Sequence, residues 1–189
     1  LVLYVPAARS PHKHDSPRAT DAQRLAMLRA MADPSSVWTD ELDRTPGPSY
    51  SIDTARRARR WLDQNAGANT TLRLLIGADQ AAAFHRWREP RELIAIAEPL
   101  VMLREGDGGG SGTSDLLTVA LRATGFWTEP ELAAWRSRIV PISLREGSAT
   151  RVRELIAGRG ADVPELDELL HPLVRRYIAD HGLYRAAEA

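Results

Sequence analysis

The stretch LRLLIGADQAAAFHRW, residues 72–87, indicates how this chain folds. Its first five residues are apolar except for Arg73, which is typical of a buried strand, and the residues after GAD predict an apolar helix that ends near Trp87. In open parallel sheets, ligands bind at the carboxyl edge of the strands. Two interpretations of the turn stay open. Either Gly77 admits a ligand to the backbone and Asp79 binds a ribose hydroxyl, or the turn is an ordinary tight turn.

Composition limits the classes of protein to which the chain can belong. Its 189 residues predict one domain over 1–189, and 43% hydrophobic residues suffice for a sizeable core. Lys+Arg and Asp+Glu both number 25, which argues against a general affinity for nucleic acid or acidic membranes. The absence of Cys excludes disulfides and thiolate chemistry. No apolar run approaches the roughly 20 residues of a membrane span, so we expect a cytoplasmic protein without membrane partners. Nucleic-acid partners are not expected either, and a monomer and a homodimer both stay open.

Strands and helices alternate along the chain, which predicts an α/β fold with a mainly parallel sheet and helices on both faces. Strands are predicted over 1–5, 37–38, 72–76, 100–103 and 139–143. Besides the helix after GAD, helices are predicted over 21–33, 51–65, 91–98, 114–124, 129–138, from Ser148 onward, and over 164–170 and 172–180. The Gly-rich run over 106–114 predicts a flexible loop, because it lacks the lysine and hydroxyl of a phosphate-binding P-loop.

The helix predicted over 51–65 follows the loop TPGPSYS. Ser51 or Asp53 is expected to cap it, and Ile52, Ala55, Ala58 and Leu62 are expected to line its buried face. Its arginine run, RRARR over 56–60, has only Trp61 as an aromatic neighbour. That pattern favours a solvated helix face over a nucleic-acid patch.

The start of the helix at Ser148 is an unusual place for arginines. Ser148 is a good N-cap, yet Arg151 and Arg153 lie in the first turns. Cations at the positive end of a helix dipole cost about 0.3–1 kcal/mol each. A bound anion would reverse that cost, and helix N-termini are ready phosphate sites. A phosphate site is therefore favoured over two solvated arginines.

Two further residues have a functional and a structural interpretation. Lys13 lies in the loop after the first strand, on the same predicted sheet edge as Gly77, where it could contact a phosphate. Trp87 either packs in the core or stacks on a flat heteroaromatic ring. Glycine, hydroxyls, Arg/Lys and backbone N–H groups suit phosphoryl or nucleotidyl transfer, in which an enzyme aligns groups and stabilises charge.

With these residues assembled, the chain resembles the bacterial nicotinate-nucleotide adenylyltransferase family over nearly its whole length. The stretches that carry the resemblance are LYVPAARSPHK (3–13), QRLAML (23–28), ELDRTPGPSYSIDT (41–54), LLIGAD...F..W (74–87), LVMLREG (100–106), SATRVR (148–153) and YIADHGLY (177–184). The order of PSYSIDT, IGAD...W and SATxVR is specific, whereas any one of them alone is weak.

The resemblance implies a Rossmann-like nucleotidyltransferase fold with C-terminal helices. It implies an enzyme of NAD biosynthesis that uses ATP with Mg²⁺ and transfers AMP to nicotinic acid mononucleotide, giving deamido-NAD and pyrophosphate. The acceptor's 5′-phosphate attacks the α-phosphate in line, without a covalent enzyme intermediate. Two alternatives remain. One is a related nucleotidyltransferase with another acceptor, such as nicotinamide mononucleotide, and the other is a non-catalytic nucleotide-binding remnant.

The resemblance also implies roles for particular residues. Ser51 stands where the family usually has Thr and keeps the hydroxyl that holds the pyridine carboxylate. Trp87 matches the position that packs on the nicotinate ring. The other matches are Gly77 and Asp79 at nucleotide sugars, Lys13 at a phosphate, Arg104 on the adenylate side, and Ser148, Thr150 and Arg153 at the ATP phosphates. No metal ligand is implied in this chain.

The chain departs from the family pattern at two places. Gly147 replaces the usual apolar residue before SxT. The family's GG[ST]F[DN]PxHxGH motif, which binds the triphosphate and stabilises the transition state, has no counterpart, because His12 and His14 are spaced H-x-H and follow the second family strand. The chain opens on an apolar strand without Met. We therefore expect an N-terminally truncated sequence that lacks the first strand and the catalytic histidines, so that this fragment is unstable and inactive although its full-length parent is an enzyme.

Overall fold

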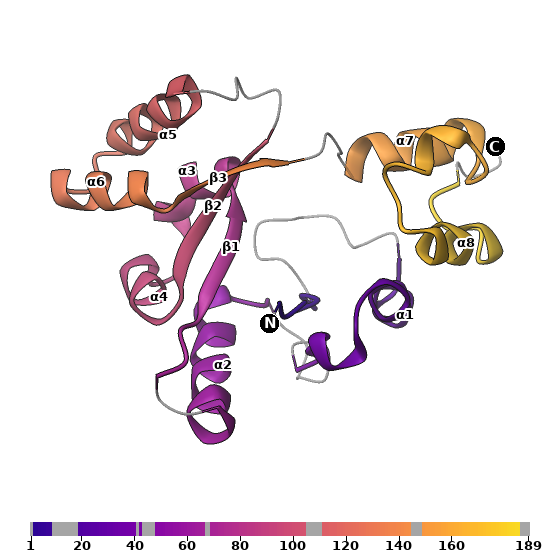
Figure 1. The fold of residues 1–189 in the computed structure, drawn as a ribbon, viewed down its shortest axis with the longest axis horizontal. Helices are drawn as coiled ribbons and strands as arrows, with labels where there is room; N and C mark the ends of the chain where they lie inside the picture. Colours follow the sequence, from indigo (N-terminus) through magenta and orange to yellow (C-terminus); the bar gives the residue numbers. More distant parts are fainter. Residues whose placement is uncertain are drawn as a thin grey trace. The chain divides into compact units, whose positions relative to one another are not determined.

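The structure is a computed structural model that describes residues 2–8, 19–40, 42, 48–66, 69–104, 111–144 and 149–185. The chain divides into two compact units (Figure 1). One unit is Tyr50–Glu146, and the other combines Leu1–Ser49 with Gly147–Ala189. The prediction of a single domain over 1–189 stays a prediction.

The Tyr50–Glu146 unit is built on a parallel sheet of three strands in the order β1-β2-β3. The strands are β1 (Arg73–Gly77), β2 (Glu98–Arg104) and β3 (Ile139–Leu144). Gly77 lies opposite Met102, and Met102 lies opposite Val140. All three strands therefore end at one edge of the sheet, and the predicted α/β fold class with a parallel sheet is confirmed.

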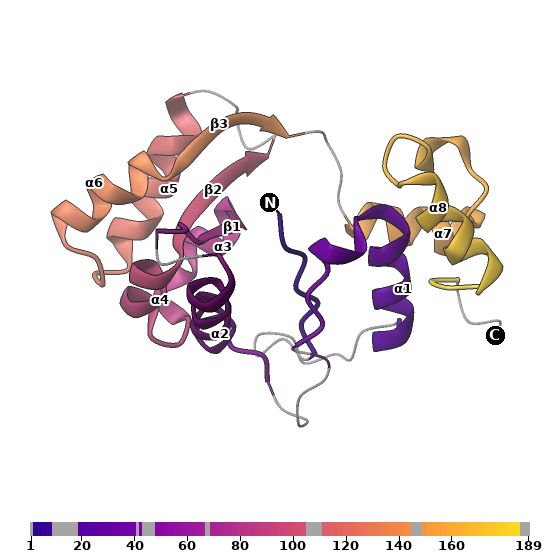
Figure 2. The same cartoon turned by 60° about the horizontal axis from the view of Figure 1, so that its bottom comes forward.

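Helices cover one face of this sheet. They are α2 (Ser51–Asn65), α3 (Ala78–Ala82), the 3₁₀ helix η2 (Phe84–Arg86), α4 (Pro90–Ile96), α5 (Ser111–Ala123) and α6 (Glu129–Ser137). In both ribbon views α2 lies beside α4, and α5 lies beside α6 (Figures 1 and 2). Their buried side chains pack with Ile76 and Val101, which are paired neighbours on the same face of the sheet. Leu75 points to the opposite face and is 54% exposed, so the described helices of this unit leave that face of β1 open.

The buried face predicted for α2 is confirmed, since Ile52, Ala55, Ala58 and Leu62 are all buried. The predicted helix after GAD is shorter than expected, because α3 ends at Ala82 and a 3₁₀ turn leads to Trp87. Proline at the start of α4 suits a first helical turn, where its missing N–H costs nothing.

The predicted loop over 106–114 is wrong at its C-terminal end, because α5 begins at Ser111. Leu117 and Leu121 are buried apolar residues that anchor this helix in the core. The helix extends ahead of them through a Gly- and Ser-containing turn that composition alone does not favour. Residues 106–110 lie outside the described residues.

The other unit is mainly helical. Its elements are α1 (Asp21–Met31), the 3₁₀ helix η1 (Pro34–Ser36), α7 (Ala149–Arg159), the 3₁₀ helix η3 (Pro164–Leu166) and α8 (Pro172–Asp180). A capping box between Thr20 and Gln23 begins α1, which packs against α8. The predicted helix over 164–170 is reduced to η3 and the turns that follow it.

The predicted strands over 1–5 and 37–38 appear as one parallel bridge between Tyr4 and Val37. The Tyr4 N–H donates to the Ser36 carbonyl at 2.7 Å, and the Trp38 N–H donates to the Tyr4 carbonyl at 2.9 Å. Two hydrogen bonds make a local contact rather than a sheet. Within the described part of the chain, no helix is long and apolar enough to cross a membrane.

The start of α6 carries a charge whose effect on stability can be measured. Glu131 accepts from the Arg91 Nε at 2.6 Å and from the Thr128 backbone N–H at 2.8 Å. The Arg91 guanidinium, followed by the Thr128 N–H, holds the pKa of Glu131 at about 2, below its ordinary 4.5. A lowered folded-state pKa contributes stability above the unfolded-state pKa, and this contribution is lost as the pH falls through the folded-state value.

We therefore expect Glu131→Gln to flatten the fall in the free energy of unfolding between about pH 4.5 and pH 2, because the neutral amide keeps the capping geometry without the charge. At pH 7 the variant should lose at most about 1 kcal/mol, since both side chains of the pair are partly exposed. Tryptophan fluorescence during denaturation measures this unit, because four of the five Trp residues lie in it. If the free energy of unfolding depends on pH in the same way in the variant and the unsubstituted protein, the lowered pKa of Glu131 is contradicted.

Candidate functional site

The carboxyl end of β1 opens onto the GAD turn. Gly77 has φ −81° and ψ 165°, an extended conformation that residues other than glycine adopt. A Cβ on Gly77 would lie 2.7 Å from the Asp79 Oδ1, so the Asp79 carboxylate fills the space that a side chain would need. Gln80 Nε2 donates to the Asp79 Oδ2 at 3.2 Å. Because Asp79 is exposed, hydroxyl groups of a ligand can reach its carboxylate at this sheet edge.

The end of β2 lies at the same edge. Arg104 is the last residue of β2, two positions beyond Met102, the partner of Gly77. The structure describes the backbone of Arg104. The sheet topology therefore places Arg104, the residue predicted to lie on the adenylate side, at the same sheet edge as the GAD turn.

Ser51 is the first helical residue of α2 rather than its cap. The N-cap is Tyr50, whose carbonyl accepts from the N–H groups of Asp53 at 3.0 Å and Thr54 at 3.2 Å, so the prediction of Ser51 or Asp53 is wrong. Helical bonding begins one residue earlier than expected, and no described side chain caps the helix. An N-terminus of this kind leaves backbone N–H groups and the positive end of the helix dipole for an anion.

Trp87 packs on one side and is half-buried. Its ring stacks on that of Phe84, with centroids 4.7 Å apart and planes at 23°. Phe84 is fully buried and meets Trp135 edge to face at 5.2 Å. Phe84 thus supports one face of the Trp87 ring, and stacking of that ring on a ligand stays a prediction.

Tyr50 and Arg88 belong to this site although sequence analysis did not select them. The Arg88 guanidinium lies over the Tyr50 ring at 5.0 Å, and its Nη1 is 3.8 Å from the Asp53 Oδ2. Tyr50 precedes Ser51 and Arg88 follows Trp87, so these contacts join two segments that were predicted separately. The sequence did offer a signal for these two residues, because each is the direct neighbour of a candidate site residue.

At Arg56 and Arg59 the arginine run of α2 forms ion pairs at the surface, and the prediction of a solvated helix face stays a prediction. Arg56 Nη2 lies 2.5 Å from the Glu89 Oε2 and 2.7 Å from the Glu92 Oε1. Arg59 Nη2 lies 2.8 Å from the Asp63 Oδ1. Hydrogen bonds from Arg56 lower the pKa of Glu89, and those to Glu92 and Glu89 raise the pKa of Arg56. The Arg56 partners Glu89 and Glu92 lie more than 30 residues away, which the local pattern did not show, whereas Asp63 lies one turn along α2 from Arg59.

The start of α7 carries two of the predicted phosphate ligands. Thr150 is exposed in the first turn, and Arg153 Nη2 lies 3.4 Å from the Thr150 Oγ1. The two side chains therefore face each other at the positive end of an 11-residue helix. Ser148 and Lys13 lie outside the described residues.

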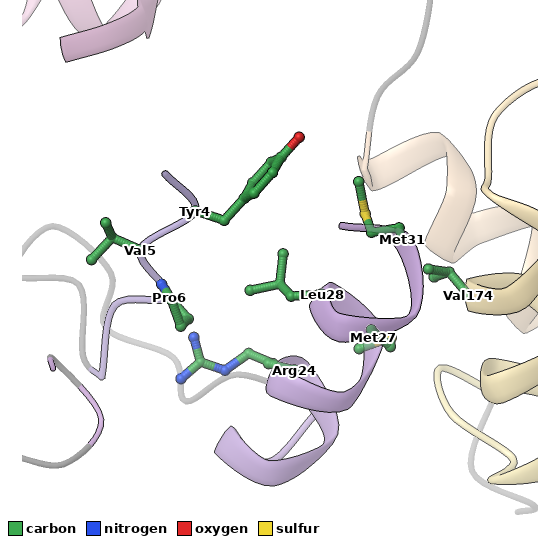
Figure 3. Close-up of a pocket in the computed structure, with 8 residues that line it drawn as sticks. All are labelled: Tyr4, Val5, Pro6, Arg24, Met27, Leu28, Met31 and Val174. Carbon is green, nitrogen blue, oxygen red and sulfur yellow. The ribbon is translucent and has the colours of Figure 1, made fainter. Parts of the chain in front are cut away.

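A hollow of about 380 Å³ lies between the N-terminal segment, α1 and α8 (Figure 3). It contains none of the predicted site residues and is lined by Tyr4, Val5, Pro6, Arg24, Met27, Leu28, Met31 and Val174. The Arg24 guanidinium donates to the Ala7 carbonyl at 2.7 Å and to Asp21 at 2.5 Å. Because its one charged group already has partners and the rest of its lining is largely apolar, this hollow is not a candidate for phosphate chemistry.

Comparison with known proteins places the chain in a family, although no protein-family model matches it. It is 38% identical over 197 residues to a probable nicotinate-nucleotide adenylyltransferase of Stenotrophomonas maltophilia, covering 98% of this chain and 84% of that protein. It is 32% identical to a protein with the same description from Thermomicrobium roseum, covering 100% of this chain and 79% of that protein.

Solved structures agree on the fold. The Plasmodium falciparum nicotinic acid mononucleotide adenylyltransferase complexed with NaAD has a TM-score of 0.57 at 14% identity, over 95% of this chain and 80% of that one. The same enzyme complexed with APC has a TM-score of 0.55, over 88% and 76%. The nucleotidyltransferase fold and the identity to relatives along nearly all of its length lead to one conclusion: this chain belongs to the nicotinate-nucleotide adenylyltransferase family.

Proposed function

We propose that residues 1–189 supply substrate-binding groups of an enzyme that transfers the AMP part of ATP to nicotinic acid mononucleotide, releasing pyrophosphate and giving deamido-NAD. The expected inactivity of residues 1–189 on their own stays a prediction. The observation that carries the proposal is the meeting of the Tyr50–Ser51 and Trp87–Arg88 segments within one unit. An uncapped helix start and a half-buried indole are suited to a ligand with a carboxylate on an aromatic ring. Family membership supplies the reaction class.

The acceptor binds in this unit. The Ser51 hydroxyl and the first N–H groups of α2 hold the pyridine carboxylate, where the helix dipole adds to the hydrogen bonds. The pyridine ring stacks on Trp87, whose other side rests on Phe84. The exposed Asp79 carboxylate accepts from ribose hydroxyls at the end of β1, and Gly77 leaves room for it.

Cationic and hydroxyl side chains hold the phosphates. We assign Lys13 to the acceptor phosphate, Arg104 to the adenylate side, and Ser148, Thr150 and Arg153 to the ATP phosphates. A 5′-phosphate oxygen of the acceptor attacks the α-phosphorus of ATP, and the bond from that phosphorus to the pyrophosphate oxygen breaks. The residues of this chain contribute alignment and charge neutralisation, and none is assigned a proton-transfer role.

Mg²⁺ belongs to this proposal as the partner of ATP. In the parts of the chain that the structure describes, no group of three or more His, Asp or Glu side chains could hold a metal ion. We therefore assign the ion to the triphosphate and name no protein ligand for it. A cytoplasmic location is part of the same proposal.

Ser51→Ala tests the acceptor assignment. The unsubstituted chain should bind nicotinic acid mononucleotide more tightly than nicotinamide mononucleotide, and removal of one hydrogen bond to a charged group should weaken acid binding about ten-fold. Binding of the amide should change little. Isothermal titration calorimetry with both mononucleotides measures the four affinities.

Ser51→Thr is the matched control for this test, because it restores the hydroxyl that most family members have at this position. It should bind the acid as the unsubstituted chain does. Equal affinities of Ser51→Ala and Ser51→Thr for the acid would contradict the role of the hydroxyl. Preference of the unsubstituted chain for the amide would replace the proposed acceptor.

Gly77→Ala tests the role of Asp79. The added Cβ would lie 2.7 Å from the Asp79 Oδ1, and this atom is the far end of a side chain that can move. We expect a change in melting temperature of less than about 3 °C, since the backbone conformation is allowed for alanine. Affinity for the mononucleotide should fall about ten-fold, because the carboxylate is displaced from the ribose hydroxyls. Unchanged affinity, measured by the same calorimetry, would remove Asp79 from the site.

A further inference from the structure

The side chain of Arg56 connects the helix that starts at Ser51 with the segment that follows Trp87. Arg56 Nη2 lies 2.5 Å from the Glu89 Oε2, and its Nε lies 3.0 Å from the Glu92 Oε1. Arg56 also approaches Asp53, at 3.5 Å, on its own helix. One guanidinium therefore bridges the first turns of α2 and the start of α4.

The backbone of Glu89 shows why this connection matters. Glu89 has φ 50° and ψ 55°, the left-handed conformation that residues with a Cβ rarely adopt. Pro90 follows it, and a proline further restricts the backbone of the residue before it. The direction in which the chain passes from Trp87 into α4 depends on this residue. One carboxylate that Arg56 binds therefore belongs to the residue of this segment that has a left-handed backbone.

Arg88 provides a second connection between the same two segments. Its guanidinium lies over the ring of Tyr50 and beside the Asp53 carboxylate. The two arginines therefore connect the segments in opposite directions. Arg56 reaches from α2 to Glu89, and Arg88 reaches from the segment after Trp87 to Tyr50. Both pairs are separated by more than 30 residues in sequence, so they act on tertiary placement rather than on helix propensity.

We propose that Arg56 is a positioning residue that holds the segment over 87–92 against the start of α2 and thereby sets the placement of Trp87 relative to Ser51. The inference deepens the proposed function and rests on it for the identity of the ligand. Arg56 touches neither the ring nor the carboxylate of the acceptor in this account. It acts through Glu89.

Global stability is a poor measure of the role of Arg56. Surface ion pairs contribute little to global stability, and the side chains of the Arg56 pairs are partly exposed. If the Arg56 ion pairs are merely structural, their removal should leave the local order near Trp87 unchanged, and it should not weaken acceptor binding more than ATP binding. A positioning role should change both, with the melting temperature almost constant.

Arg59 offers a matched control on the same helix. It pairs with Asp63 within α2 and donates to the Thr70 carbonyl, so it makes the same kind of contacts without reaching the segment over 87–92. Arg56→Met and Arg59→Met each remove one guanidinium and keep most of the aliphatic chain. Arg56→Lys keeps the charge but not the fork that spans two glutamates.

Two measurements on the full 189-residue chain test the proposal. By hydrogen–deuterium exchange, Arg56→Met should speed exchange in peptides over 84–93 by about ten-fold, whereas Arg59→Met should leave them unchanged. By calorimetry, Arg56→Met should weaken nicotinic acid mononucleotide binding about ten-fold with ATP binding unchanged, and Arg56→Lys should lie between. Glu89→Gly, which suits the left-handed backbone, provides a second route to the same loss of the ion pair and should weaken acceptor binding in the same way.

The outcomes test the positioning role of Arg56 separately from the proposed function. Equal exchange over 84–93 in the Arg56→Met and Arg59→Met variants would overturn the positioning role. Equal loss of acceptor and ATP affinity in Arg56→Met and Glu89→Gly would overturn it as well. If the unsubstituted chain binds no nicotinic acid mononucleotide, the proposed function fails, and the exchange measurement still determines whether Arg56 orders the segment.

Discussion

The parallel pairing of β1 with β2 is the constraint on which the rest of the Tyr50–Glu146 unit depends. Because Gly77 lies opposite Met102, both strands deliver the chain to the same edge of the sheet. The same register places Ile76 beside Val101, and these two side chains belong to the buried cluster that also contains Phe84 and Trp135. Trp87 stacks on Phe84 and thereby contacts this core.

Ion pairs add to the core packing by connecting α2 with the start of α4. The chain has no net charge, and Arg56 of α2 pairs with two carboxylates from the start of α4. This pairing leaves two features for a negatively charged, hydroxyl-bearing ligand: the helix N-terminus at Ser51 and the exposed carboxylate of Asp79. A site of this kind discriminates by geometry and local dipoles rather than by overall charge.

Sequence patterns predicted the elements that depend on near neighbours. The apolar run before GAD predicted β1, and the helical spacing of Ile52, Ala55, Ala58 and Leu62 predicted the buried face of α2. The partners of Arg56 and the contact of Arg88 with Tyr50 involve residues more than 30 positions apart, which no local period reveals. The roles given to Ser51 and Trp87 came from family resemblance, because a hydroxyl or an indole alone does not identify its ligand.

A crystal structure of this chain with nicotinic acid mononucleotide tests the central claim most directly. The account predicts the pyridine ring against the exposed side of Trp87, with its carboxylate within hydrogen-bonding distance of the Ser51 hydroxyl or the first N–H groups of α2. A mononucleotide ordered elsewhere, with Ser51 and Trp87 both free of contact, would contradict it.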